Sequence, residues 1–338
     1  MRHAGIVGLG LIGGSIGAGL VAAGWDVTGY DADPDHAAAA SDRRLASRVV
    51  ASVSDVLAGS PDVIVVAVPP KATIECLAGL ATDTVVMDVA GVKGAIVPAG
   101  RHLPNFVGTH PMAGRETAGP NAASPSLFRG AAWVVMDDAT PVARDAVQSV
   151  VDELGARVVT MSAVEHDAAV ARISHVPQLL AGALLATAAD GHALPLAAGS
   201  FRDLTRVGAS QPIPWVEILR DNADEVLGAI GDLKGHLAVL EAAILTNDDA
   251  LLSLLSVARE TRRSMGAPAA EVRIALADQP GEIARVGHAL EATGVDVRDL
   301  QLRHAPHGGG GVMTISVRPG HEDELATALE REGLLLVP

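Results

Sequence analysis

The stretch "GIVGLGLIGGS", residues 5 to 15, decides the fold of the N-terminal part of this chain. It leads from a short apolar strand through Gly8, Gly10 and Gly13 into a segment that favours a helix. In this G-x-G-x-x-G spacing the first glycine permits a tight turn, the second lets a pyrophosphate approach the backbone, and the third lets helix and strand pack closely. The helix then directs its N–H groups and its dipole at the phosphates. The predicted cofactor-binding residues of this loop are Gly8, Gly10, Leu11, Ile12 and Gly13.

The next predicted strand ends in "VTGYD" and places Asp31 where a carboxylate can accept hydrogen bonds from the adenosine ribose hydroxyls. This carboxylate would repel a 2′-phosphate, and the following "ADPD" contains no arginine that would bind one. NAD is therefore favoured over NADP, and an ordinary turn residue is the alternative for Asp31. Val68 and Pro69, in "AVPP", end another strand at the same edge. We expect them to touch the cofactor, although a simple turn explains them nearly as well.

Composition changes along the chain and predicts three domains. Residues 1–161 alternate short β-branched runs with alanine-rich helical runs, which is typical of a Rossmann-like, doubly wound parallel sheet buried on both faces. In residues 162–265 helical periodicity replaces the strand signals, and we expect an all-helical domain that binds substrate and buries a dimer face. After a linker at 266–271, residues 271–338 follow the ferredoxin-like βαββαβ pattern.

Composition also excludes several classes of function. The 25 Lys and Arg residues against 40 Asp and Glu residues give a net charge of −15, which disfavours nucleic acid as a partner. The apolar runs are broken by Gly, Asp or Pro before the ~18 residues of a membrane helix, and the first residues lack the pattern of a signal peptide. We therefore expect a cytoplasmic protein without a membrane segment. Cys76 is the only cysteine, so we expect no disulfide and no metal site.

His110, in "GTHPMAG", follows the predicted strand "NFVG" at its carboxyl end. Doubly wound sheets bind their ligands at this edge. A neutral imidazole can accept a proton from an alcohol while hydride leaves the same carbon. We therefore predict that His110 is the catalytic base of a dehydrogenase, with an ordinary surface histidine as the alternative.

The helical region carries a second group of candidates in "FRDLTRVG". Arg202 and Arg206 are four residues apart and share one helical face. Their guanidinium groups can grip a carboxylate, with Asp203 orienting one of them, and an exposed salt-bridged face is an equal alternative. The two arginines should also disfavour protonation of a nearby His110. His175, in "SHVPQLL", is a weaker candidate because a histidine on an apolar helix is more often a satisfied core residue.

The motifs "GLGLIGGS", "VTGYD", "GTHPMAG", "SHVPQLL" and "FRDLTRVG", in this order, resemble the prephenate dehydrogenase family of tyrosine biosynthesis over roughly residues 4 to 260. The resemblance implies NAD-dependent oxidative decarboxylation of prephenate to 4-hydroxyphenylpyruvate. From the apolar helices we expect a homodimer through the helical domain. The resemblance also implies that His110 accepts a hydrogen bond from the ring hydroxyl and that Arg206 binds a substrate carboxylate. The other residues that it places around the substrate are His175 in the pocket wall, and Glu116 and Asp203 as acids that pair with the arginine and help gate the site.

Two residues depart from the family pattern. Gly91, in "DVAGVKG", stands where family members usually carry a serine close to the histidine and the nicotinamide, which puts a hydroxyl-mediated relay in doubt. Arg115 stands where a small polar residue is common. It either adds a cation that favours the anionic pyruvyl side chain of the substrate or points to solvent.

The C-terminal segment, with "LADQPGEIARVGHAL", resembles an ACT domain. The resemblance implies that tyrosine or phenylalanine binds near Asp278, Gln279 and Gly281 and alters activity, and a purely dimerising domain is the alternative. For the whole chain, arogenate remains an alternative substrate. An amino-acid-responsive binding protein with a degenerate catalytic half ranks lower. A β-hydroxyacid dehydrogenase also ranks lower, because that class lacks the histidine motif and the two-arginine helix.

Overall fold

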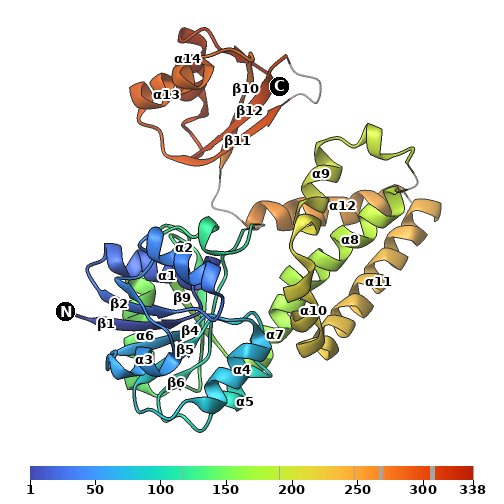
Figure 1. Cartoon of the computed structure of the whole chain (residues 1–338). Coiled ribbons are helices and arrows are strands. Elements are labelled where there is room, and N and C mark those ends of the chain that lie inside the picture. Colours follow the sequence, from blue (N-terminus) through green and yellow to red (C-terminus); the bar gives the residue numbers. More distant parts are fainter. Residues whose placement is uncertain (116, 190, 247, 266–268, 305–308, 338) are drawn as a thin grey trace. The chain divides into compact units, whose positions relative to one another are not determined.

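The computed structural model describes the whole chain except residues 116, 190, 247, 266–268, 305–308 and 338 (Figure 1). The chain forms two compact units, Met1–Lys234 and Gly235–Pro338. The first unit contains two sheets, the helices that pack on them and a series of helices that begins at residue 163. The second contains the last part of this helical series, from residue 235 on, and a smaller antiparallel sheet with two helices packed on it.

The first unit is built on a six-stranded parallel sheet with the order β3-β2-β1-β4-β5-β6. Its strands are β1 (His3–Val7), β2 (Asp26–Tyr30), β3 (Arg48–Val49), β4 (Val63–Val66), β5 (Val85–Asp88) and β6 (Phe106–Val107). The order reverses between β1 and β4, and the carboxyl ends of the strands at such a switch point line a ligand crevice. The predicted Rossmann-like sheet is therefore confirmed.

Helices cover both faces of this sheet and explain its continuous apolar strands. In β4, Val63 and Val65 pack in one core cluster with α1 and α6, while Ile64 and Val66 pack in another with α4 and α5. A strand buried on both faces has no polar side to alternate with its apolar side. The helices are α1 (Leu11–Ala22), α2 (Pro34–Asp42), α3 (Val53–Ala58), α4 (Pro70–Gly79), α5 (Ile96–Gly100) and α6 (Pro141–Glu153).

A second, three-stranded sheet departs from the expected single sheet. It has the order β7-β8-β9, with an antiparallel β7–β8 pair and a parallel β8–β9 pair. The strand predicted in "NFVG" ends at Val107 and a separate strand begins at Thr109; at Gly108 between them a Cβ atom would lie 2.8 Å from Cγ of Met136. The chain leaves the first sheet at this glycine, and His110 pairs with Val134 of the second. The strands are β7 (Thr109–Pro111), β8 (Ala132–Met136) and β9 (Arg157–Met161).

The helices that follow are α7 (Ala163–Val170), the π-helical turn η2 (Ala171–His175), α8 (Val176–Ala188), α9 (Gly199–Thr205), the short turn η4 (Arg206–Ala209), α10 (Pro212–Asp221), α11 (Ala223–Thr246) and α12 (Asp248–Ser264). The π-helical turn lies just before Pro177, which has no N–H to donate to a carbonyl four residues earlier. The N–H of Val176 instead donates to the carbonyl of Ala171, one residue further back than in an α-helix.

The run Ala163–Ala188 also corrects an expectation about hydropathy. It is a helix of 26 residues with a mean hydropathy of 1.3 in its most apolar window, long and apolar enough to cross a membrane by these two measures. Only 28% of that window is buried. One helix of this kind is weak evidence for a membrane span, because core helices of soluble proteins meet the same criteria. The same run carries His166, Asp167 and His175, which belong to the site described below.

The second unit confirms the βαββαβ order. After the end of α11 and the helix α12, its elements are β10 (Ala270–Leu276), α13 (Glu282–Thr293), β11 (Val297–His304), β12 (Gly311–Val317), α14 (Glu322–Arg331) and β13 (Leu335–Leu336). The antiparallel sheet has the order β11-β12-β10-β13, as the ferredoxin-like pattern requires. Its apolar face packs with both helices around Ile274, Ile315 and Leu325.

Candidate active site

The glycine loop has the geometry that a dinucleotide requires. Gly8 has φ +95°, and a Cβ atom there would lie 2.4 Å from the carbonyl oxygen of Ala67. A Cβ on Gly13 would lie 1.9 Å from the carbonyl oxygen of Gly8, so both positions exclude a side chain. At Gly10, by contrast, a Cβ would meet nothing within 4 Å. The first turn of α1, which includes Leu11 and Ile12, has neither an acidic residue nor a side-chain cap, so its N–H groups are available to a pyrophosphate.

Asp31 joins the end of β2 to the glycine loop. Its Oδ2 accepts a hydrogen bond of 2.7 Å from the N–H of Leu9, and its Oδ1 accepts one of 2.9 Å from the N–H of Asp33. Each carboxylate oxygen keeps further acceptor capacity for a ribose hydroxyl. Val68 adjoins the loop, because its Cγ1 lies 2.7 Å from where a Cβ of Gly8 would be, and Pro69 is exposed just before α4. These residues thus gather at the carboxyl ends of β1, β2 and β4.

His110 belongs to a hydrogen-bonded cluster that sequence analysis missed. Its Nδ1 lies 2.9 Å from Nε2 of His166 on α7, and Nδ1 of His166 lies 2.7 Å from Oδ1 of Asp167. The two imidazole rings meet edge to face, with centroids 5.1 Å apart. His166 and Asp167 occur in "AVEHDAAV", which we interpreted only as an amphipathic helix. An adjacent His-Asp pair at the start of a helix was the available signal, but no spacing rule connects it to a strand 56 residues earlier.

Backbone N–H groups anchor Asp167 in this cluster. The N–H of Lys93 donates to Oδ1 at 2.8 Å, and the N–H of Gly94 donates to Oδ2 at 2.7 Å. Burial by itself raises the pKa of Asp167, but the hydrogen bonds from His166, Gly94 and Lys93 outweigh it and lower the pKa. Asp167 is therefore ionised at neutral pH.

Burial also keeps His110 neutral. It lowers the pKa of His110 well below the ordinary histidine value, and the charges of His166, Lys93 and His175 lower it further. The direction agrees with the sequence-based expectation, but the cause differs: Arg202 and Arg206 were expected to produce the shift and do not contribute to it. A neutral imidazole is the form that can accept a proton.

Gly91 leaves room beside the other edge of His110. A Cβ on Gly91 would lie 3.6 Å from Nε2 of His110, which is an ordinary contact distance. A serine would therefore fit here, and this chain lacks it. Among the residues that the structure describes, no side chain hydrogen-bonds to Nε2 of His110, so this nitrogen is available to a substrate.

A buried ion pair holds the strand that carries His110. Lys93 is fully buried, and its Nζ donates to Oδ2 of Asp88 and, at 2.7 Å, to the carbonyl oxygen of Thr109. Oδ1 of Asp88 accepts from the N–H of Thr109 at 3.1 Å. Burial lowers the pKa of Lys93, and the charge of Asp88 opposes that effect. The pair thus connects β5 to β7 directly beside His110.

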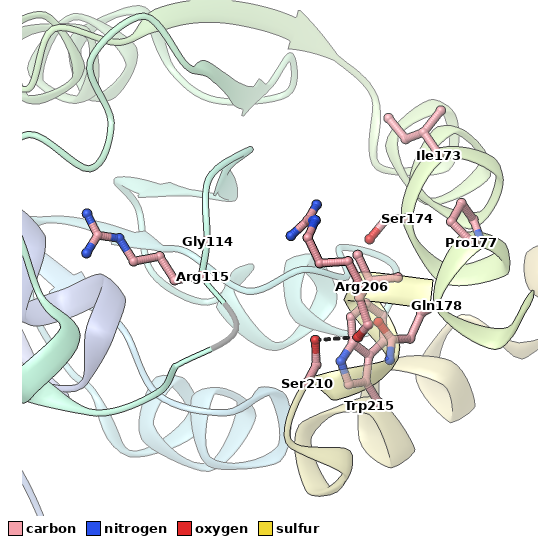
Figure 2. Close-up of a pocket in the computed structure, with 10 residues that line it drawn as sticks. Gly114, Arg115, Ile173, Ser174, Pro177, Gln178, Arg206, Ser210 and Trp215 are labelled. Atoms are coloured by element: carbon pink, nitrogen blue, oxygen red, sulfur yellow. Dashed lines mark hydrogen bonds between the residues drawn. The ribbon is translucent and has the colours of Figure 1, made fainter. Parts of the chain in front are cut away.

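A cavity of about 320 Å³ lies between the loop after β7 and the helices α8 to α10 (Figure 2). Its lining residues are Gly114, Arg115, Ile173, Ser174, Pro177, Gln178, Arg206, Val207, Ser210 and Trp215. Figure 2 shows the side chain of Arg115 directed away from that of Arg206. Gln178 and Trp215 were not among the predicted site residues, because an amide and an indole on helices carry no spacing signal. His110 itself does not line this cavity, although Gly114 follows it by four residues.

The other predicted substrate residues either do not line this cavity or lie outside the described residues. Arg202 and Asp203 are exposed on α9 and do not line it, and Glu116 lies outside the described residues. His175 is only 2% exposed and does not line it either; the neighbouring Ser174 does.

His175 packs inside the helical region instead. Its Nδ1 lies 3.2 Å from Nδ2 of Asn222, and its ring meets that of Trp215 edge to face at 6.1 Å. Burial, with a smaller contribution from His166, lowers the pKa of His175 to about 4, although Asp167 opposes the shift. A neutral His175 therefore supports Trp215 in the cavity wall.

In the second unit, Asp278 and Gln279 line a small cavity of about 100 Å³ together with Glu282 and His304. Gly281 does not line it but caps α13 with φ +97°. Two of the three residues expected to bind an effector thus share one cavity.

Family models and a similar protein of known sequence agree on the family of this chain. A model described as "prephenate dehydrogenase, nucleotide-binding domain" matches residues 18–160, and one described as "prephenate dehydrogenase, dimerization domain" matches residues 162–257. A protein of Streptomyces niveus named "probable prephenate dehydrogenase" is 30% identical over an alignment of 363 positions, and the alignment covers 98% of each chain.

Solved structures agree with these matches. The fold is similar to that of prephenate dehydrogenase from A. aeolicus in complex with hydroxyphenyl propionate and NAD+, with 27% identity, a TM-score of 0.73, and coverage of 78% of this chain and 98% of that one. It is also similar to arogenate dehydrogenase from Synechocystis, with 29% identity, a TM-score of 0.68, and coverage of 78% and 100%. With a glycine loop shaped for a dinucleotide and a neutral histidine on the adjoining sheet, this chain belongs to the prephenate dehydrogenase family.

Proposed function

We propose that this chain catalyses the NAD-dependent oxidative decarboxylation of prephenate to 4-hydroxyphenylpyruvate. The observation that carries the proposal is His110, which burial holds neutral on the strand that follows the nucleotide-binding sheet. In its family context, such a group suits the removal of a proton from a ring hydroxyl. The residues that fit NAD are Gly8, Gly10, Leu11, Ile12, Gly13, Asp31, Val68 and Pro69.

The protein's own residues prepare the substrate for the reaction. NAD, when bound, supplies the hydride acceptor. His110 accepts the hydroxyl proton of the substrate at Nε2, while Arg206 in the cavity wall binds a carboxylate. Loss of the ring carboxylate as CO₂ makes the ring aromatic, which drives the reaction forward. The contribution of the protein is positioning and preorganised charge.

The charge of the cavity favours prephenate over arogenate. Its described lining residues include Arg115 and Arg206 and no acidic side chain. Prephenate carries a keto side chain with a carboxylate, whereas arogenate adds an ammonium group, which needs a carboxylate or another acceptor nearby. Arogenate remains the second candidate, because one similar solved structure is an arogenate dehydrogenase.

An assay of NADH or NADPH formation by the purified protein tests the proposal directly, with prephenate or arogenate as substrate and NAD or NADP as cofactor. We expect the highest kcat/KM with prephenate and NAD. His110→Asn should lower kcat by about 10²-fold or more with little change in KM, because it removes the proton acceptor and leaves the binding residues in place. Preference for arogenate would replace the proposed substrate, and the absence of NADH with both substrates would overturn the proposed activity.

We further propose a cytoplasmic homodimer with functional domains at 1–161, 162–265 and 271–338. The name of the matching dimerization model supports the dimer, as do the apolar side chains left exposed on the helices, such as Leu227, which is 66% exposed, and Leu252, which is 65% exposed. For the C-terminal domain we propose an ACT-like role, with an aromatic amino acid bound near Asp278 and Gln279. Calorimetric titration with tyrosine and phenylalanine tests it, and no binding at millimolar ligand would remove the proposal.

A further inference from the structure

We infer that His166 and Asp167 are positioning residues that fix the proton-accepting tautomer of His110. The inference rests on the proposed role of His110 as the proton acceptor. The three side chains form an unbroken hydrogen-bonded chain of 2.9 Å and 2.7 Å from the imidazole of His110 to the carboxylate of Asp167. The side chain of His166 is 1% exposed and that of Asp167 is 8% exposed, so both are largely shielded from water.

Asp167, the last member of the hydrogen-bonded chain, determines which atom donates in each of its hydrogen bonds. The carboxylate of Asp167 is ionised and can only accept, and two backbone N–H groups already hold it in place. Nδ1 of His166 therefore carries a proton, and its Nε2, in the neutral ring, is an acceptor. That acceptor requires a proton on Nδ1 of His110, which leaves the lone pair of His110 on Nε2. Nε2 is the nitrogen that faces the space beside Gly91.

The same chain can spread the positive charge that catalysis creates. When Nε2 of His110 takes the hydroxyl proton, the ring becomes an imidazolium that still donates from Nδ1 to His166. Transfer of the Nδ1 proton to Nε2 of His166 moves the charge next to the Asp167 carboxylate and returns His110 to a neutral ring. Each step forms one N–H bond and breaks one bond to hydrogen, so protons and charge are conserved.

Gly91 explains why His110 is held from only one edge among the described residues. With no side chain at position 91, the loop offers no hydroxyl to orient His110 from its Nε2 edge. Orientation comes instead from the opposite edge, through His166. Nearby charged or titratable groups include Lys93, which pairs with Asp88, and His175, whose partner Asn222 also donates to the carbonyl oxygen of Asp167 at 2.9 Å. Arg220, Asp221, Asp224 and Glu225 line a pocket together with Asp167.

Two substitutions separate positioning from simple structural support. We expect His166→Asn and Asp167→Asn each to lower kcat with prephenate by about 10²- to 10⁴-fold, with the KM for prephenate and the Kd for NAD within about 3-fold of the original values. The acidic limb of the kcat/KM profile should move to lower pH in both variants. Each substitution removes a group of the hydrogen-bonded chain that stabilises the imidazolium form of His110, so the pKa of His110 should fall.

His102→Asn is the matched control, because His102 lies on the surface of the same unit and, among the residues that the structure describes, hydrogen-bonds to the backbone carbonyls of Ala99 and Leu80. It should leave kcat unchanged. A loss of kcat in His166→Asn and Asp167→Asn without this shift of the acidic limb would overturn the inference. If His110→Asn abolishes turnover while His166→Asn and Asp167→Asn keep it, the positioning role of His166 and Asp167 fails and the proposed function stands. If His110→Asn keeps full turnover, the proposed role of His110 fails.

Nitrogen-15 NMR of the histidine rings in the unaltered protein gives an answer that does not depend on the folding of variants. We expect the Nδ1 signal of His110 to be that of a protonated nitrogen and the Nε2 signal to be that of a nitrogen with a free lone pair. The reverse assignment would overturn the inference.

Discussion

At the scale of single residues, burial sets the chemistry of the site. His110 and His175 both have lowered pKa values, with burial as the largest cause for each. Their neutral state at physiological pH suits one to accept a proton and the other to pack against Trp215. The same burial couples both residues to the stability of the fold, because an unfolded histidine is protonated at a higher pH than these two.

We therefore expect the free energy of unfolding to fall as the pH is lowered from about 6.5. Below the ordinary histidine pKa of about 6.5 the unfolded chain binds protons that folded His175 binds only at about pH 4. Each such histidine contributes a slope of up to about 1.4 kcal/mol per pH unit in this window. Urea unfolding followed by tryptophan fluorescence measures it. His175→Gln should show a shallower slope, and an equal slope in both proteins would contradict the assignment.

The two arginines of the cavity should differ in their effects. We expect Arg206→Ala to raise the KM for prephenate by about 10-fold or more with a smaller change in kcat, because a carboxylate loses its charged partner. Arg115→Thr should have a weaker effect, since the side chain is exposed and directed away from Arg206. Steady-state kinetics with prephenate compares them. A larger effect at Arg115 would move the carboxylate site to the loop after β7.

At the scale of elements, features set by the spacing of a motif could be predicted from the sequence. Features set by contacts between distant segments could not. The glycine loop and Asp31 were predicted because their geometry depends on residues close together in the sequence. The break between β6 and β7 lies where Gly108 packs closely against Met136, and the hydrogen-bonded chain from His110 ends at Asp167, which accepts from the backbone N–H of Lys93. Such contacts between distant segments leave no periodic pattern in one sequence. Sequence reasoning therefore found His110 but missed the residues that hold it.

Two glycines of the loop provide a matched pair of tests. Gly13→Ala should lower both stability and NAD affinity, because its Cβ would lie 1.9 Å from the carbonyl oxygen of Gly8. Gly10→Ala should leave stability within about 0.5 kcal/mol, because its Cβ meets no protein atom, yet lower NAD affinity by about 10-fold or more where the pyrophosphate approaches the backbone. Thermal unfolding and NAD titration separate the two effects. Unchanged NAD affinity in Gly10→Ala would place the pyrophosphate elsewhere.

At the scale of the whole molecule, exposed apolar side chains on the helices favour self-association. In α12, Leu252 and Leu255 are 65% and 57% exposed, although leucine is usually buried. The matching dimerization model includes both. Exposed leucines three residues apart on one helix are consistent with an interface between protein chains.

We expect Leu252→Lys to shift the protein from dimer towards monomer, because a charge would be buried in the interface without a partner. Light scattering after gel filtration measures the molar mass. Val142→Lys is the control: Val142 is 73% exposed on α6, within the nucleotide-binding part, and its substitution should not change the mass. An unchanged dimer in Leu252→Lys would exclude this part of α12 from the interface.

The buried Lys93–Asp88 pair also has a consequence for how this lineage can diverge. Replacing either partner alone would strand an uncompensated charge inside the protein, at a cost of about 3 to 5 kcal/mol, comparable to much of the stability of a typical domain. A substitution at position 88 or 93 alone is therefore strongly disfavoured unless the other position changes as well. Across a collection of descendants, positions 88 and 93 should mutate as a couple, and a protein engineer who alters one must redesign the other in the same step.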